Sequence, residues 1–593
     1  MSTPPAQTIY LDGAGEPVCA IFHPPAAHFA RDTAVILCPP FGWDEVCSYR
    51  SRREWAKRLA ADGYGAIRVS FPGTGDSGGS PRDPDRLDAW TASVSAAGSW
   101  LRVATGARRI VAIGMGLGGL VAYRAAATGG TVDDLVLWST PARAGAMIRE
   151  LRTFSRLERA QFFDGHEQPP PLPTGQLEAG GFLLTAQTVA ELEQLELTAL
   201  PLPNASARRI LMLDRDGIAA DPQLHDQLEG WGVAVSLDSG SGYAAMTSHP
   251  QQARAPHEVI ERVTRWLGET AGAARVRPTL GHASDSAELQ VGGDGEVKET
   301  PVAIEQPFGA LSAVLTEPLG PREPGLCVVL LNAGAVRRIG PSRMWVEAAR
   351  RWAAAGVPTL RLDVEGIGDA DGDETPYAED AGLYVPELVP QVLSALDFLQ
   401  ERGVGERFVL GGLCAGAYWA FHSALLDPRV ASALMVNPRA LIWDPGLAPA
   451  RDLRALISRP SWSRIRRAAA SGRGRELARW MLASPGRRAA QLRARAEATP
   501  HRLDQALDQL HATGKRALLL FADGEPLDDE LRRSGRMARI ERWSTVTVER
   551  IGVRDHTLRP NWAQAQFHEI LDRALARERS SAQLREPATR LTA

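Results

Sequence analysis

One cysteine stands where a nucleophile could be held on a sharp turn. The segment Gly412-Leu413-Cys414-Ala415-Gly416 has the form G-x-nucleophile-x-G, in which small residues let a strained strand-to-helix turn pass close to neighbouring chain. A thiol in that place lies at a helix N-terminus, where the dipole favours the thiolate and the N–H of Ala415 can stabilise an oxyanion. A buried cysteine in a tight turn has the same local sequence, so the turn alone leaves both interpretations open.

A histidine and two carboxylates follow this cysteine in the order that nucleophilic catalysis needs. The apolar stretch RALLLFADGE ends in Asp523 and Glu525, and TVTVERIG leads to Asp555 and His556. We expect His556 to be the base, although a surface histidine is the simpler alternative. Glu525, directly before a proline, is favoured over Asp523 as the carboxylate that orients the ring, and Asp555 is too close in sequence to reach it from behind.

The elements that must position these residues occur twice in the chain. RREWAKRLAADGYGAIRVSFPGTGDSGG is matched 293 residues later by SRMWVEAARRWAAAGVPTLRLDVEGIGDADG, so that Arg68 and Asp76 correspond to Arg361 and Asp369. Each copy then runs through an apolar strand into a glycine-rich turn and alternates strands with helices. This spacing predicts an α/β fold with two tandem domains, each a mostly parallel sheet with helices on both faces.

The boundaries follow from changes in composition. We expect a first domain over residues 1–267, a linker of small polar residues over 268–286, and a second domain over 287–593. Each domain contains a long insertion between two sheet strands, over 141–207 in the first and 446–515 in the second. Structureless loops of this length are improbable, so we expect inserted, largely helical caps.

The second copy resembles the α/β-hydrolase superfamily, and within it the tandem bacterial members of the serine-aminopeptidase-like (S33) branch. The resemblance rests on VLLNAGAVRRIGPSRMW, LRLDVEGIGDADG, GLCAGAYWAFHSAL and DHTLRP, which run from residue 328 to 560. It implies a covalent acyl-enzyme, with the loop at Ala333 and Gly334 supplying the second oxyanion donor beside Ala415. Most relatives use serine, and the cysteine is similar to that of polyhydroxyalkanoate synthases and some thioester-using acyltransferases, whose remaining signatures are not found here.

The first copy has Gly116 at the nucleophile position, which predicts a degenerate site. Asp216 stands in the place of the acid. Related hydrolases look as if they place Asp-Pro-His where this chain has His249-Pro250-Gln251, which puts Gln251 at the base position, and His249 could partly substitute. The alternative is a dinucleotide fingerprint G-x-G-x-x-G over residues 114–119, but no acid follows at the end of the next strand.

Composition restricts the class of protein. Of the 593 residues, 44% are hydrophobic and 23% charged, and the net charge is −3, which fits a globular chain without a global field for nucleic acid. Five scattered cysteines indicate reduced thiols and make no paired metal-ligand spacing. No apolar run is long enough to span a bilayer and no leader pattern is recognisable, so we expect a cytoplasmic protein with neither metal nor cofactor.

A cysteine nucleophile also bears on the reaction. Its acyl-enzyme is itself a thioester, so exchange with a thioester donor stays nearly balanced in free energy and the acyl group remains transferable. We therefore expect acyl transfer from a coenzyme A or carrier-protein thioester. Release of the acyl chain to water by a thioesterase, and a non-catalytic ligand-binding or scaffolding protein, are the alternatives.

The second insertion carries an unusual charge. Residues 446–515 contain 14 arginines and Lys515 against five acids. Arg464, Arg466 and Arg467 lie at near-helical spacing and could bind an acidic acyl carrier protein or the phosphates of its arm or of coenzyme A. Solvated arginines on a helical cap would explain the same charge.

Overall fold

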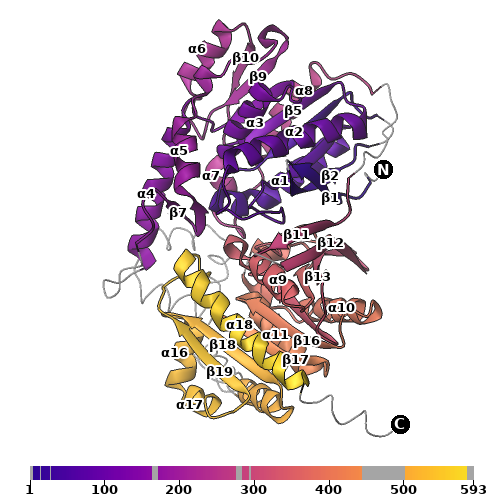
Figure 1. The fold of residues 1–593 in the computed structure, drawn as a ribbon, viewed down its shortest axis with the longest axis vertical. Helices are drawn as coiled ribbons and strands as arrows, with labels where there is room; N and C mark the ends of the chain where they lie inside the picture. Colours follow the sequence, from indigo (N-terminus) through magenta and orange to yellow (C-terminus); the bar gives the residue numbers. More distant parts are fainter. Residues whose placement is uncertain are drawn as a thin grey trace, which may run out of the picture.

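The computed structural model describes residues 4–13, 15–26, 29–162, 171–274, 283–292, 295–378, 380–443 and 501–583. Two large sheets follow one another along the chain and are stacked along the long axis of the molecule (Figure 1). The first is built from strands between residues 7 and 238, and the second from strands between 287 and 551.

The first sheet has eight strands in the order β1-β2-β4-β3-β5-β6-β9-β10. Strands β1 and β2 pair antiparallel, β2 pairs antiparallel with β4, and every other pair is parallel. The strands are β1 (Gln7–Gly13), β2 (Glu16–His23), β3 (Thr33–Cys38), β4 (Gly65–Val69), β5 (Arg109–Met115), β6 (Asp134–Trp138), β9 (Arg209–Leu213) and β10 (Ala234–Asp238). The helices are α1 (Trp43–Ala61), α2 (Arg86–Thr105), α3 (Leu117–Thr128), α6 (Pro222–Gly230), α7 (Tyr243–Met246) and α8 (His257–Gly268).

The second sheet has one additional edge strand, β11, followed by the same strand order, so that its nine strands run β11-β12-β13-β15-β14-β16-β17-β18-β19. The strands are β11 (Ala287–Val291), β12 (Gly295–Gln306), β13 (Gly309–Pro318), β14 (Leu326–Leu331), β15 (Thr359–Asp363), β16 (Arg407–Leu413), β17 (Val430–Val436), β18 (Arg516–Ala522) and β19 (Val546–Ile551). The helices are α9 (Met344–Ala354), α10 (Leu388–Glu401), α11 (Ala415–Leu426), α16 (Pro526–Arg533), α17 (Arg536–Ile540) and α18 (Asn561–Gln583). Short 3₁₀ turns η4 (Thr375–Ala378) and η5 (Asp380–Tyr384) precede α10.

The central strands are buried on both faces because both faces carry helices. Strands β3 and β14 read TAVILC and LCVVLL and are buried at every position, as expected for parallel strands between two helix layers. In the first domain α1 and α8 pack on one face, and α2 and α3 pack on the other. In the second domain α9 and α18 form one layer and α10 and α11 the other. The prediction of an α/β fold with two tandem domains, each a mostly parallel sheet with helices on both faces, is confirmed.

The insertion of the first domain lies between β6 and β9. It contains α4 (Ala144–Phe162), the two-stranded sheet of β7 (Leu177–Ala179) and β8 (Phe182–Leu184), α5 (Ala186–Gln194), and the 3₁₀ turns η1 (Leu197–Ala199) and η2 (Ala205–Ala207). Most of the corresponding insertion of the second domain, residues 444–500, lies outside the described residues, and so do Arg464, Arg466 and Arg467.

The two domains share an extensive interface. An apolar cluster joins Tyr10 of β1 and Cys19 of β2 to Leu289 of β11 and Val297 of β12. Beside it the corresponding residues of the two copies form reciprocal ion pairs, Arg68 with Asp369 and Arg361 with Asp76. The same surface of each copy therefore contacts the other copy, as in an isologous dimer, but here the two copies belong to one chain.

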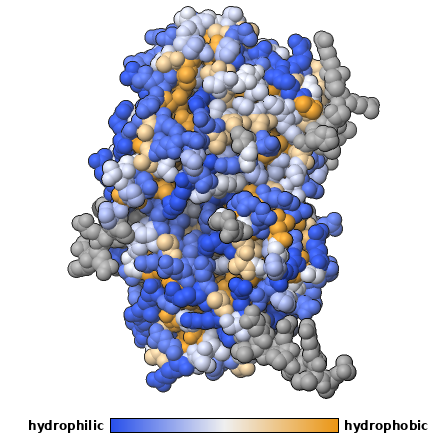
Figure 2. Space-filling view, in the orientation of Figure 1, coloured by the Kyte–Doolittle hydropathy of each residue, from blue (hydrophilic) through white to orange (hydrophobic). Residues whose placement is uncertain are grey.

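Hydrophilic residues cover most of the face seen in Figure 2, with hydrophobic residues in patches between them. Among the helices of the described part of the chain, none combines the length and apolarity that a bilayer crossing requires.

Candidate active site

The turn between β16 and α11 holds Cys414 in a strained backbone conformation, with φ 59° and ψ −113°. A Cβ on Gly412 would lie 2.1 Å from the carbonyl carbon of Gly416, and a Cβ on Gly416 would lie 2.3 Å from the backbone oxygen of Asn332. Only glycine fits these two positions, because any side chain would collide with backbone. The turn therefore holds the Cys414 side chain at the N-terminus of α11, against the loop that follows β14.

The ring of His556 lies between Cys414 and a buried carboxylate. Its Nδ1 is 2.8 Å from Oε1 of Glu525, and the ring is close enough to the Cys414 thiol to lower the pKa of that thiol. Glu525 is 6% exposed, whereas Asp523, two residues earlier, is exposed to solvent. Of the two acids considered from the sequence, the structure thus brings Glu525 to His556, with Asp555 turned to Arg559 instead.

A side chain at the end of β17 fixes the loop that carries His556. Asn437 follows the strand directly and its Nδ2 donates a hydrogen bond to the backbone oxygen of His556 at 2.7 Å. Its Oδ1 accepts from the N–H of Ala522 at 2.6 Å, at the end of β18. Asn437 therefore joins the loop that carries His556 to the end of β18, which the loop carrying Glu525 follows.

The electrostatics of the site favour an ion pair between the thiol and the imidazole. Burial alone would raise the pKa of Cys414, but the charge of His556, its hydrogen bond and a hydrogen bond from Tyr384 outweigh burial and lower that pKa below its ordinary value. Burial likewise acts to lower the pKa of His556, and the Cys414 thiolate and Glu525 raise it well above its ordinary value. The arrangement thus favours a thiolate beside an imidazolium.

Tyr384 contacts the cysteine and was not found from the sequence. Its hydroxyl lies 3.5 Å from Cys414 Sγ, and its ring stacks on Trp443 and meets Tyr418 edge to face. The side chain is 2% exposed, so the hydroxyl is held at the sulfur by packing. No local motif surrounds Tyr384, and its proximity to a residue 30 positions away arises only when η5 packs on α11.

The loop after β14, which carries Ala333 and Gly334, lies beside the first turn of α11. Asn332 anchors it by donating to the oxygens of Val336 and Asp363 and by accepting from the N–H of Val364. The close approach of Gly416 to Asn332 puts this loop beside the first turn of α11, which begins at Ala415. Ala333 and Gly334 follow Asn332 directly, and Gly334 adopts φ 58°.

The first domain repeats the frame of this site without its reactive groups. Gly116 has φ 53° and ψ −117°, close to the values of Cys414, so its turn is the same elbow and not a dinucleotide-binding loop. Asp216 follows β9 by three residues, as Glu525 follows β18, but it accepts hydrogen bonds from the backbone N–H groups of Gly242 and Ala244.

The base position of the first domain holds a tyrosine, which corrects our expectation of Gln251. Tyr243 follows β10 by five residues, as His556 follows β19, and its hydroxyl would lie 3.2 Å from a Cβ on Gly116. Gln251 instead lines a pocket between the two domains. The cause is the short helix α7, which begins at Tyr243 and carries the chain away from the elbow before residue 251 is reached.

Among the described residues, no group of three or more His, Cys, Asp or Glu side chains is arranged to hold a metal ion. The cysteines other than Cys414 are buried, and burial raises the pKa of each. Cys414 is therefore distinguished from them by both exposure and charge environment.

Comparison with known proteins agrees with this fold. Residues 35–287 match the model of the alpha/beta hydrolase family. None of the curated proteins matches the chain by sequence. Among solved structures, Est1E from Butyrivibrio proteoclasticus with ferulic acid bound is 16% identical with a TM-score of 0.32, covering 44% of this chain and 98% of its own.

Two further solved structures are of the same kind. An α/β serine hydrolase without a lid from Xanthomonas campestris is 16% identical with a TM-score of 0.29, covering 46% of this chain and 98% of its own. Dienelactone hydrolase from Anabaena variabilis is 14% identical with a TM-score of 0.30, covering 46% of this chain and 95% of its own. At such identities and scores, the ligands and reactions of those proteins say nothing about this chain.

Proposed function

We propose that this protein transfers acyl groups through a covalent thioester on Cys414, with His556 as the base and Glu525 as the carboxylate that orients it. The observation that carries the proposal is the placement of His556 between Glu525, whose Oε1 lies 2.8 Å from Nδ1, and Cys414 on its elbow turn, whose pKa the imidazole lowers. A buried structural cysteine would need neither a charged partner nor a strained backbone.

The reaction has two balanced steps. The Cys414 thiolate attacks the carbonyl of a thioester donor, the oxyanion is stabilised by backbone N–H groups of Ala415 and of the Ala333–Gly334 loop, and the donor sulfur leaves with the proton of the His556 imidazolium. An amine or alcohol then gives its proton to His556 as it attacks the acylated cysteine. A C–N or C–O bond forms, the C–S bond to Cys414 breaks, and the sulfur leaves as a thiolate beside the protonated His556, which restores the starting ion pair.

The carboxylate of Glu525 supports both steps. At 2.8 Å from Nδ1 it fixes the ring so that Nε2 faces the sulfur, and it stabilises the imidazolium. Attack by water in place of the acceptor would make the protein a thioesterase. A non-catalytic binding protein is the remaining alternative, and the lowered pKa of Cys414 speaks against it.

Intact-mass measurement tests the proposal. After incubation with the thioester of an acyl group and N-acetylcysteamine, the protein should gain one acyl mass, and Cys414→Ala should gain none. Cys327→Ala, which removes a buried cysteine of the same domain, is the matched control and should acylate like the parent protein. An adduct that persists in Cys414→Ala would overturn the assignment.

We further propose that the donor is bound to an acyl carrier protein or coenzyme A through the basic insertion that contains Arg464, Arg466 and Arg467. Exposed charges act over a shorter range as the Debye length falls from about 30 Å at 0.01 M salt to about 8 Å at 0.15 M. Reversing these three charges should raise KM for a carrier-bound donor and leave KM for a small uncharged thioester unchanged. Equal effects on both donors would contradict the role.

A further inference from the structure

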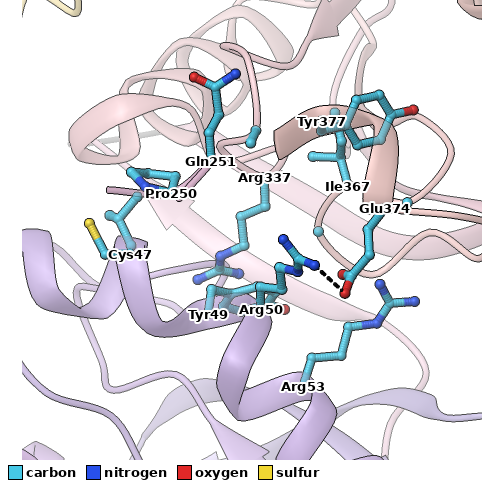
Figure 3. A pocket seen from close by; sticks show the side chains of 14 residues that line it. Cys47, Tyr49, Arg50, Arg53, Pro250, Gln251, Arg337, Ile367, Glu374 and Tyr377 are labelled. Atoms are coloured by element: carbon cyan, nitrogen blue, oxygen red, sulfur yellow. Dashed lines mark ion pairs between the residues drawn. The ribbon is translucent and has the colours of Figure 1, made fainter. Parts of the chain in front are cut away.

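A pocket opens between the two domains. Its volume is about 500 Å³, part of which is open to solvent. The first domain contributes one face of α1 together with Pro250 and Gln251, and the second contributes the loops after β14 and β15 together with η4, as Figure 3 shows. Neither domain alone encloses this space.

The lining of the pocket is basic. Arg50, Arg53 and Arg337 face it against a single acid, Glu374, whose carboxylate lies between the guanidinium groups of Arg50 and Arg53 (Figure 3). Arg50 pairs with Glu374 at 2.7 Å, but both side chains are about one-third exposed, so this ion pair is weak and can be exchanged for a ligand's anion. Arg53 donates to the backbone oxygen of Ala370.

The layer beneath the pocket has an excess of buried positive charge. Eight buried arginines lie at the interface against five carboxylates that are at most 9% exposed. The arginines are Arg52, Arg53, Arg68, Arg337, Arg338, Arg343, Arg350 and Arg361, and the carboxylates are Glu45, Asp76, Glu299, Asp363 and Asp369. Four more carboxylates, partly or fully exposed, lie nearby, namely Glu347, which pairs with Arg343 at 2.6 Å, and Asp371, Asp373 and Glu374 of the neighbouring loop, and solvent screens their charge. The Nε of Arg337 is buried and has no partner among the described residues.

Two segments that line the pocket also carry residues of the Cys414 site. Ala335 lines the pocket, and it is two residues from Ala333 of the oxyanion loop, which limits their Cα separation to roughly 7 Å. Tyr377 lines the pocket from η4, and Tyr384 of the adjoining turn η5 contacts Cys414 Sγ. The pocket and the Cys414 site therefore lie along the same two stretches of chain.

We propose that this interdomain pocket binds the acyl acceptor, a small molecule with a carboxylate or phosphate that Arg50 and Arg53 recognise. The inference rests on the proposed acyl transfer and names the class of its second substrate. Guanidinium groups bind both anions with paired hydrogen bonds, and the pocket is too small for a protein donor. The first domain, without a nucleophile of its own, then supplies the acceptor site for the second.

Anion binding is measured apart from catalysis, on full-length Cys414→Ala protein titrated with inorganic phosphate in a calorimeter. Adding Arg50→Gln and Arg53→Gln together should weaken binding at least tenfold. Arg58→Gln, on the same helix but paired with Glu261 outside the pocket, is the matched control and should bind like the parent. Glu374→Gln should tighten binding about two- to fivefold, a gain that a folding defect cannot produce. Equal binding by all variants would overturn the site.

The acceptor role is tested on protein first acylated at Cys414 with an uncharged thioester. Deacylation should saturate with glycine or glycerol 3-phosphate and rise only linearly with glycinamide or glycerol. In the protein that carries both Arg50→Gln and Arg53→Gln, deacylation should no longer saturate with these acceptors. The factor by which the deacylation rate falls should be at least ten times any change in the acylation rate. Phosphate binding without saturable deacylation would overturn the acceptor role. Failure of Cys414 to acylate at all would overturn the proposed function instead, while the phosphate titration would still report on the pocket.

Discussion

Arg68 of the first domain lies 2.7 Å from Asp369 of the second, and the two side chains are 3% and 9% exposed. The corresponding residues Arg361 and Asp76 form the reciprocal pair. The duplication thus places each copy's arginine against the other copy's aspartate, which fixes the register between the domains. That register brings α1 to the loops around Cys414.

Removing one member of this cluster should destabilise the whole chain. Asp369→Asn removes the carboxylate paired with the buried Arg68 and one of the three paired with Arg338, which costs about 3–5 kcal/mol in the free energy of unfolding. Asp88→Asn, in an exposed ion pair with Arg124, should cost less than about 1 kcal/mol. Urea denaturation measures both values, and similar midpoints for the two variants would contradict the role of the cluster.

The same cluster predicts how stability depends on pH. Burial acts to raise the pKa of Asp369, but Arg68 and Arg338 outweigh it and hold the pKa well below its usual range. Asp76 is held low in the same way, by Arg338 and Arg361. Their contribution is complete above the unfolded pKa of about 3.9 and is lost as pH falls towards the folded values. At pH values below about 4, the urea midpoint should therefore decrease more steeply with falling pH in the parent protein than in Asp369→Asn.

Reactivity of Cys414 should persist below the usual thiol pKa. Since His556 lowers that pKa, alkylation by iodoacetamide should remain fast as pH falls from 8.5 towards 7, where an ordinary thiol with a pKa of about 8.5 slows. His556→Ala should move the inflection to higher pH, because burial is then opposed only by the hydrogen bond from Tyr384 and the charge of Arg439. Tyr384→Phe removes one hydrogen bond to the sulfur and should give a smaller shift in the same direction. An inflection unchanged by His556→Ala would show that the two groups are not coupled.

The two carboxylates near the histidine should differ in effect. Glu525→Gln keeps the shape but loses the charge beside Nδ1, and we expect acylation to slow by about 10²–10⁴-fold, as we also expect for His556→Ala. Asp523→Asn alters an exposed side chain and should change the rate less than threefold. Stopped-flow measurement of thiol release from the donor gives these rates. The opposite ranking would transfer the role to Asp523.

A serine placed on the first elbow should stay inactive. In Gly116→Ser the new Cβ lies 3.2 Å from the hydroxyl of Tyr243, which is not a base at neutral pH, and Asp216 remains bound to backbone N–H groups. Hydrolysis of p-nitrophenyl acetate by Gly116→Ser in a Cys414→Ala background should equal that of Cys414→Ala alone. Clear turnover would reveal a working base in the first domain.

The duplication, the alternating strands and helices, and the elbow around Cys414 could all be predicted from sequence, because each depends on short-range patterns. Apolar periodicity reports burial, and Gly412 and Gly416 are required by backbone approach at the turn itself. The order of cysteine, acid and histidine could be predicted for the same reason, since each follows a recognisable strand.

Only the tertiary structure decided which side chains meet. Glu525 is buried at His556 and Asp523 is exposed, a difference set by where the chain turns after β18. Tyr243, and not Gln251, occupies the base position of the first domain. That position is set by the end of β10, and the sequence does not show at which residue this strand ends. Tyr384 and the arginines of the interdomain pocket come from segments far apart in the chain, and packing between those segments has no local signal.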